Sequence, residues 1–144
     1  MATDKFIGAW KLISAEFRSS DGKVIYPYGK DAVGLIIYNS AGQMSVHLMR
    51  TDRPAFASGD PLKGTAEEIK AAFEGYLGYF GTYEVNEQDG TVIHCVHGSS
   101  FPNWVGEDQK RYFQFTGSQL ALKTPPTPFG GVTIAGILIW ERVP

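Results

Sequence analysis

Residues 79–98 decide the fold: Tyr79-Phe80-Gly81-Thr82-Tyr83-Glu84-Val85-Asn86-Glu87-Gln88-Asp89-Gly90-Thr91-Val92-Ile93-His94-Cys95-Val96-His97-Gly98. Two runs rich in aromatic and β-branched residues, 79–87 and 91–98, flank the turn signal Gln88-Asp89-Gly90. Such runs on either side of a turn signal are typical of a β-hairpin. The stretch therefore predicts an antiparallel pair of strands.

The same succession of short runs and turns continues on both sides of this hairpin. Turn signals lie at 19–22, 39–42 and 116–118, and looser segments at 52–64, 99–106 and 124–131. Further strands are expected at 8–18, 23–28, 32–38, 43–51, 109–115, 119–123 and 132–142. Eight or nine short strands in sequential hairpins predict an all-β fold, a closed antiparallel up-and-down barrel, because closure removes exposed strand edges.

One segment departs from this pattern. Thr65-Ala66-Glu67-Glu68 fits a capping box, in which Thr65 caps the helix and Glu68 reaches back. Apolar residues then recur at helical spacing as far as Leu77. We therefore expect one short helix around residues 65–78, with Gly78 as its C-cap.

Composition narrows the function classes. The net charge of −2 lacks the basic footprint of a nucleic-acid-binding protein, and no apolar run reaches the ~18 residues of a membrane span. Residues 1–5 lack the apolar core of a signal peptide, and Cys95 is the single cysteine. We expect one domain over residues 1–144 in the cytoplasm, with neither nucleic acid nor membrane as partner. A homodimer is possible, because symmetric dimers are the commonest assembly.

Common cofactor and nucleophile motifs are absent from the sequence. It contains no phosphate-binding glycine loop, dinucleotide fingerprint or Gly-x-Ser-x-Gly elbow. His94 and His97 are an odd number of residues apart, so one strand directs them to opposite faces. We therefore expect no cofactor and no metal.

His94 and Glu16 are the candidate catalytic residues. His94 lies between Val92 and Val96 on one strand face, and Glu16 falls on the face of Trp10 in the first strand. A buried histidine stays neutral and can exchange a proton, and a buried glutamate can act as an acid or orient the imidazole. The alternative is a hydrogen-bonded core histidine and a surface glutamate.

The inward faces predict an aromatic and aliphatic wall with few polar groups, which is typical of a small-molecule pocket. We expect the glycines at 34, 81, 98 and 136 to leave room for a ligand; the alternative is an interior filled by side chains. Arg50, Arg53 and Arg111 could hold an oxyanion, or could form rim salt bridges with acidic neighbours, namely Asp52, Glu107 or Asp108.

The remaining candidates are aromatic and amide side chains. Asn103 and Trp104 follow a proline in a loop and could contact a planar ligand, or could plug one end of the barrel. Among the tyrosines, Tyr38 and Tyr83 are the ones whose hydroxyl groups we expect to face inward. The predicted ligand-binding residues are Tyr38, Met44, Arg50, Tyr83, Asn103, Trp104 and Arg111.

Several motifs resemble the bacterial and fungal lipocalin-like domain family. They are Gly8-Ala9-Trp10, Tyr26-Pro27-Tyr28-Gly29, Ile37-Tyr38, Gly42-Gln43-Met44-Ser45, Met49-Arg50, Phe73-Glu74-Gly75-Tyr76, Tyr79-Phe80-Gly81-Thr82-Tyr83 and Phe101-Pro102-Asn103-Trp104-Val105-Gly106. The resemblance covers essentially the whole chain. It implies a closed barrel with a short helix over one end, Arg142 packed on Trp10, and the Trp10–Glu16 face directed inward.

Similar barrels act in secondary metabolism as isomerases, cyclases or small-molecule binders. Combined with the residues above, the resemblance favours a mostly apolar, oxygenated small molecule as partner. We expect a cofactor-free enzyme that isomerises, cyclises or dehydrates this molecule by proton transfer, with His94 and Glu16 at its centre. The alternative is a binding or carrier protein that performs no chemistry.

Overall fold

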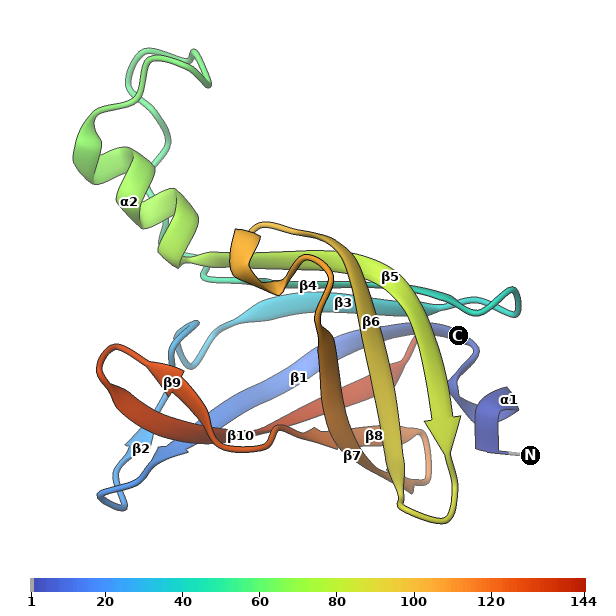
Figure 1. Ribbon diagram of the computed structural model, residues 1–144. Coiled ribbons are helices and arrows are strands. Elements are labelled where there is room, and N and C mark those ends of the chain that lie inside the picture. The colour runs from blue at the N-terminus through green and yellow to red at the C-terminus, as the bar shows by residue number, and fades with distance from the viewer. Residues whose placement is uncertain (1) are drawn as a thin grey trace.

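A computed structural model describes residues 2–144 and shows a barrel of antiparallel strands (Figure 1). The strands are β1 (Gly8–Ser19), β2 (Val24–Ile25), β3 (Val33–Tyr38), β4 (Gln43–Met49), β5 (Tyr76–Asn86), β6 (Thr91–Ser99), β7 (Asp108–Thr116), β8 (Gln119–Lys123), β9 (Thr127–Phe129) and β10 (Val132–Arg142). The helices are α1 (Ala2–Phe6), α2 (Ala66–Glu74) and the single 3₁₀ turn η1 (Pro102–Trp104).

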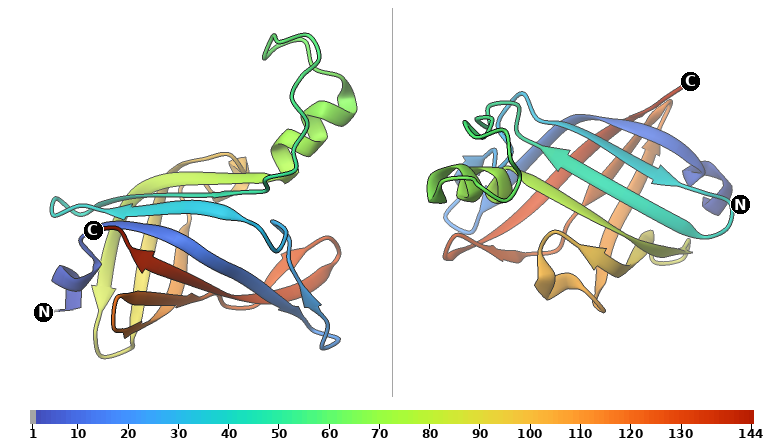
Figure 2. Two further views of the ribbon diagram at one scale, coloured as in Figure 1. Left: turned by 180° about the vertical axis from the view of Figure 1, so that it is seen from behind. Right: turned by 90° about the horizontal axis from the view of Figure 1, so that it is seen from above.

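The sheet closes on itself. Its strand order is β2-β1-β3-β4-β5-β6-β7-β8-β10-β9, and β1 also pairs with β10. Eight strands thus form the barrel, and the short β2 and β9 extend it at one end (Figure 2). The closed, all-β, up-and-down barrel predicted from the hairpin signals is confirmed.

The helix in the middle of the chain is shorter than predicted. Its capping box at Thr65 and Glu68 is present, but the helix ends at Glu74 with Gly75 as its C-cap, not at Gly78. Tyr76 and Leu77 instead begin β5, because they pair in register with β4. Their apolar side chains pack in the sheet. The spacing of apolar residues alone could not show whether these two residues end a helix or begin a strand.

The two α-helices lie at opposite ends of the barrel (Figure 1). The resemblance implied a helix lying across one end of the barrel. Instead, the helix α2 has no buried residue and projects away from the strands (Figure 2). The helix α1, which the sequence pattern did not predict, ends in the fully buried Phe6. Within residues 2–144, no helix is long and apolar enough to span a membrane.

The chain termini are tied together at the α1 end. The indole Nε1 of Trp10 donates a hydrogen bond of 2.9 Å to the Phe6 carbonyl. The guanidinium of Arg142 lies 4.1 Å from the centre of the Trp10 ring and donates to the Ile7 carbonyl at 2.8 Å. The packing of Arg142 on Trp10 that the resemblance implied is thereby confirmed.

A β-bulge in β1 changes which side chains face inward. In the pairing with β10, Leu12 lies opposite Trp140 and Ser14 opposite Ile139, so Ile13 is the extra residue. Before the bulge, Trp10 and Leu12 point into the barrel; after it, Ala15 does. An inserted residue shifts a strand's alternation by one position, so the inner face changes from even to odd numbers.

Candidate functional site

A chain of three polar side chains lies inside the barrel. The Tyr38 hydroxyl, from the end of β3, is 2.7 Å from Nε2 of His94. The Tyr79 hydroxyl, from the start of β5, is 2.7 Å from Nδ1 of the same ring. His94 itself projects inward from β6, between Val92 and Val96, as predicted. Both imidazole nitrogens therefore have a tyrosine partner.

Burial keeps this chain uncharged. His94 is 1% exposed, and its burial, followed by the neighbouring Arg111, lowers its pKa well below the ordinary value. Burial raises the pKa of Tyr38 and of Tyr79, because the phenolate loses more solvation than the phenol. At neutral pH the three groups form a neutral Tyr–His–Tyr chain, which we call the interior chain.

Arg111 brings a positive charge next to the interior chain. It projects from β7 into the barrel opposite Val92, which lies two positions before His94 on β6, and it is 9% exposed. Its guanidinium donates a 2.9 Å hydrogen bond to the Lys110 carbonyl, and its charge and hydrogen bonding favour the ionised form of Tyr79. In the described part of the chain, the ion pairs with carboxylates are made by Arg18, Lys23 and Arg50 and do not include Arg111.

Two aromatic side chains of the core also carry polar groups that can donate a hydrogen bond. The indole Nε1 of Trp140, a residue that is 1% exposed, has no hydrogen-bond partner. Tyr28 is also buried, and burial with the neighbouring Tyr79 raises its pKa to about 12. No carboxylate is among the buried side chains of residues 3–144, whose polar or charged members, apart from tyrosine and tryptophan, are Ser19, Thr91, His94 and Arg111.

Tyr79 is a site residue that the sequence analysis missed. It shares a strand face with Tyr83, which was chosen, and lies 15 positions before His94. The signal was available: alternation along 79–87 puts Tyr79 on the same side as Tyr83. The motif alone did not show which tyrosine would reach the histidine, because that depends on the pairing of β5 with β6.

The prediction that Glu16 faces the interior is wrong. Its neighbours Ala15 and Phe17 contribute to the core, whereas the Glu16 side chain is 40% exposed and pairs with Arg18 at 3.3 Å. The bulge at Ile13 is the physical reason, since the alternation that directs Trp10 and Leu12 inward shifts by one position after it. His94 therefore has two tyrosines as partners in place of a glutamate.

Of the three arginines, only Arg111 reaches the interior chain. Arg50 forms a rim ion pair with Asp52 at 2.9 Å and a hydrogen bond to the Pro27 carbonyl at 3.1 Å, so the salt-bridge alternative describes it. The Asp52 hydrogen bond and charge raise the pKa of Arg50. Arg53 stacks over the Tyr76 ring at 5.3 Å and donates to the Ala72 carbonyl, where it supports the end of α2.

The remaining predicted residues have different surroundings. Met44 is buried in the core, and Tyr83 is buried with its hydroxyl donating to the Asn39 carbonyl at 2.8 Å. Trp104 is half-buried and packs edge-to-face on Tyr79, with ring centres 5.5 Å apart. Asn103 is exposed. The loop thus brings Trp104, but not Asn103, to the interior chain.

The four glycines do not leave the room that we expected. A side chain at Gly136 would meet the Phe17 ring at 2.2 Å, and one at Gly98 would meet the Phe80 ring at 2.4 Å. Both pairs are direct cross-strand neighbours, so the aromatic rings cover the glycines. At Gly34 and Gly81 the neighbouring strand backbone approaches to 2.5 and 1.8 Å of the added atom. These glycines serve strand packing.

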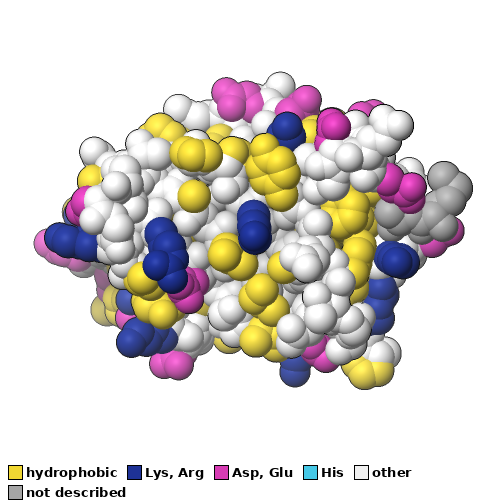
Figure 3. Space-filling view, turned by 90° about the horizontal axis from the view of Figure 1, so that it is seen from below, with side chains coloured by type: hydrophobic (Ala, Val, Ile, Leu, Met, Phe, Trp, Pro, Cys, Tyr) yellow, Lys and Arg dark blue, Asp and Glu magenta, His cyan; other side chains and the backbone are white. Residues whose placement is uncertain are grey.

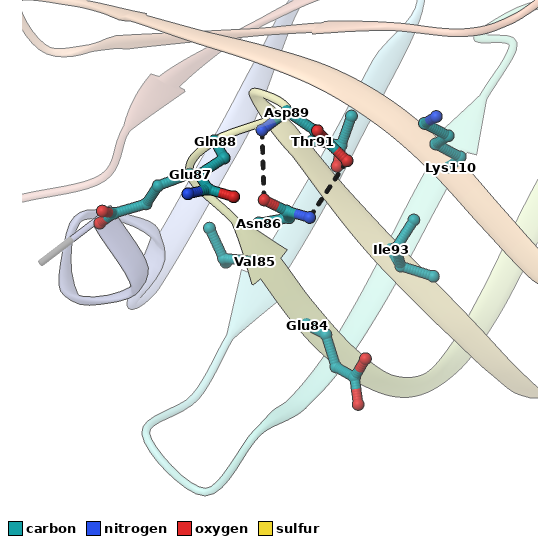
Figure 4. Close-up of a pocket in the computed structure, with 9 residues that line it drawn as sticks. All are labelled: Glu84, Val85, Asn86, Glu87, Gln88, Asp89, Thr91, Ile93 and Lys110. Atoms are coloured by element: carbon teal, nitrogen blue, oxygen red, sulfur yellow. Dashed lines mark hydrogen bonds between the residues drawn. The ribbon is translucent and has the colours of Figure 1, made fainter.

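Two surface hollows lie outside the interior chain. One is formed at the β5–β6 turn, where Asn86 and Asp89 hydrogen-bond each other at 3.1 Å in both directions (Figure 4). The other lies on the outer side of β4 and β5 beside Phe80. Charges of both signs are interspersed with hydrophobic side chains on the face seen in Figure 3. Among residues 2–144, no three His, Cys, Asp or Glu side chains lie close enough together to hold a metal ion.

The family of this chain follows from a family model and from a similar protein sequence. The chain is 35% identical over 108 residues to the 4'-hydroxy-3'-methoxypropiophenone carrier protein of Aspergillus oryzae. This alignment covers 70% of the present chain and 97% of the carrier protein. A solved REP1-NXSQ fatty acid transporter aligns over 98% of both chains at 13% identity, with a TM-score of 0.45. The family model of the lipocalin-like domain matches residues 7–143, and the chain therefore belongs to the lipocalin-like domain family.

Proposed function

We propose that this protein binds a small, mostly apolar, oxygenated molecule inside its barrel and carries it unchanged. One observation supports this most directly: polar groups able to bind a ligand oxygen are gathered in an interior otherwise made of apolar side chains. A largely apolar lining with a few convergent polar groups is the usual makeup of a small-molecule site. The carrier function of the Aspergillus oryzae relative supports the same proposal.

The α2 end of the barrel is the proposed entrance. Trp104 lies there, half-buried on η1, and its ring packs against Tyr79 of the interior chain. The Ser100 amide donates to the Gly78 carbonyl at 2.8 Å, which holds this loop beside the start of β5. A ligand that reaches Tyr79 from this end displaces or stacks on the Trp104 ring.

Carriage without chemistry is favoured over the isomerase, cyclase or dehydratase that the sequence suggested. The position of Glu16 on the outside leaves His94 without the carboxylate partner on which that mechanism depended. Both His94 nitrogens also have tyrosine partners, and its lowered pKa makes it a weak base. We propose the cytoplasm as the compartment, where a single unpaired cysteine is ordinary.

The test is titration of the protein with 4'-hydroxy-3'-methoxypropiophenone, followed by tryptophan fluorescence and by mass spectrometry of the recovered compound. We expect saturable binding that changes the emission of Trp104 and returns the compound unaltered. Trp104→Phe should remove most of the fluorescence change, whereas Tyr112→Phe, a change on the outer face of β7, should retain it. Failure to bind would contradict the proposal, and a changed mass or isomer would favour the enzyme.

A further inference from the structure

We infer that the barrel binds its ligand as an oxyanion, with the negatively charged oxygen held by Arg111 and Tyr79. This inference rests on the proposed function and adds the chemical class of the ligand. The class is a hydrophobic phenol, enol or carboxylic acid in its deprotonated form. Three observations carry the argument: the charge of Arg111, the proton count of the interior chain, and the unpartnered indole N–H of Trp140 in an interior without a buried carboxylate among residues 3–144.

The charge of Arg111 requires a counter-charge. Arg111 as a whole residue is 9% exposed, and a positive charge inside the barrel is unfavourable unless it is paired. Arg50, at the rim, has a bidentate partner in Asp52, with two hydrogen bonds of 2.9 Å. Arg111 forms no such pair within residues 2–144. A ligand oxyanion would supply the missing negative charge.

The interior chain has one hydroxyl proton in excess. A neutral imidazole has one N–H donor and one acceptor nitrogen, and each tyrosine has one O–H donor. If Tyr38 donates to Nε2, then Nδ1–H donates to the Tyr79 oxygen, and the Tyr79 proton has no acceptor in the ring. In that tautomer the free proton belongs to Tyr79, whose hydroxyl interacts with Arg111 and whose ring packs against Trp104. An oxyanion placed there accepts from both groups.

The rest of the buried polar surface favours the same ligand chemistry. Trp140 Nε1 is a donor without a partner, and no buried carboxylate in residues 3–144 could receive an amine or another cation. Arg111 and the Trp140 indole can only donate, so they favour a ligand that contributes acceptors. The interior therefore discriminates against cationic ligands of similar size and apolar area.

The proton balance of binding is simple. The O–H bond of the phenol breaks, the electron pair stays on the ligand oxygen, and the proton passes to the buffer. His94 does not take the proton, because its surroundings hold it neutral. Binding of a neutral phenol should thus release up to one proton per ligand. To measure this release, the binding enthalpy is determined by calorimetry in buffers that differ in ionisation enthalpy. The slope of the binding enthalpy against the ionisation enthalpy gives the number of protons released.

The experiment compares two probes: 4'-hydroxy-3'-methoxypropiophenone and its 4'-O-methyl ether, which cannot ionise. Titrations are made at a pH at which the free phenol is protonated, with absorption spectra recorded throughout. We expect the red-shifted phenolate band to appear on binding, proton release to the buffer, and about tenfold tighter binding of the phenol than of the ether. Arg111→Met should abolish the phenolate band, whereas Tyr112→Phe should keep it.

The outcomes separate this inference from the proposed function. If the phenol binds with its neutral spectrum and the ether binds equally well, the inference is overturned and the carrier proposal stands. If neither probe binds, both are overturned for this ligand class. The comparison of the two probes uses the unaltered protein, so it remains decisive even if Arg111→Met does not fold, which circular dichroism would show.

Discussion

The α1 end of the barrel interior is packed with aromatic rings, whereas the centre contains polar and charged side chains. At the α1 end, Phe6 packs edge-to-face against Tyr38, Phe113 and Phe115, with ring centres 5.0–5.1 Å apart. In the centre, His94, Tyr79 and Arg111 put polar and charged groups where apolar ones would be more stable. Tyr38 belongs to both, through its ring and its hydroxyl. From this difference we expect the α1 end to contribute most to stability and the centre to contain the groups that we propose bind the ligand.

Removing the Phe6 ring should have the largest effect on stability. Phe6→Ala leaves a cavity among rings that cannot fully collapse, and such changes cost about 3–5 kcal/mol. The free energy of unfolding in urea measures this loss. Phe129→Ala removes a phenyl ring that is 44% exposed and should cost much less. Similar losses in the two variants would mean that the α1 end is not the stable part of the barrel.

The buried histidine in the centre should make the free energy of unfolding depend on pH. The pKa of His94 is lowered by folding, so the unfolded chain takes up a proton that the folded chain excludes in the range below about pH 6.5. Stability is therefore retained above this pH and falls as the pH decreases, by up to about 1.4 kcal/mol per unit.

Urea midpoints measured from neutral pH down to about pH 5 test this dependence, before carboxylates begin to protonate. His94→Gln keeps a polar side chain but cannot titrate, so its stability should stay nearly flat over this range. Parallel curves for His94→Gln and the unaltered protein would show that another group produces the slope. In the alkaline range the sign reverses, because the raised pKa values of Tyr38 and Tyr79 make the folded state lose stability above about pH 10.

Single hydroxyl deletions should have smaller effects. Tyr38→Phe and Tyr79→Phe each remove one hydrogen bond to His94 and should each cost about 1 kcal/mol. The double variant should differ from the sum of the two, because both hydroxyls bind one ring. Tyr112→Phe, on the outer face, is the matched control. Strict additivity would argue against a coupled chain.

The sequence pattern predicted the barrel and the inward position of His94, but it did not predict the partners of His94. Turn signals and alternation are local, and residues 91–98 keep the alternation as far as Val96. Glu16 was misplaced because the bulge at Ile13 arises from pairing with β10, which no local pattern in β1 records. Tyr79 was overlooked for the same reason: its approach to His94 depends on the register of β5 with β6.

Glu16 should therefore be among the least sensitive positions of β1. Its ion pair with Arg18 is exposed on both sides, 40% and 65%, so Glu16→Gln should change the free energy of unfolding by less than about 0.5 kcal/mol and leave ligand affinity unaltered. Its neighbour Ala15 is 3% exposed and faces the core. Ala15→Glu would bury an unpaired carboxylate and should destabilise the protein by several kcal/mol, about 3 or more. If Glu16→Gln were the more damaging of the two changes, the bulge would not direct this strand as described, and Glu16 would return as a partner of His94.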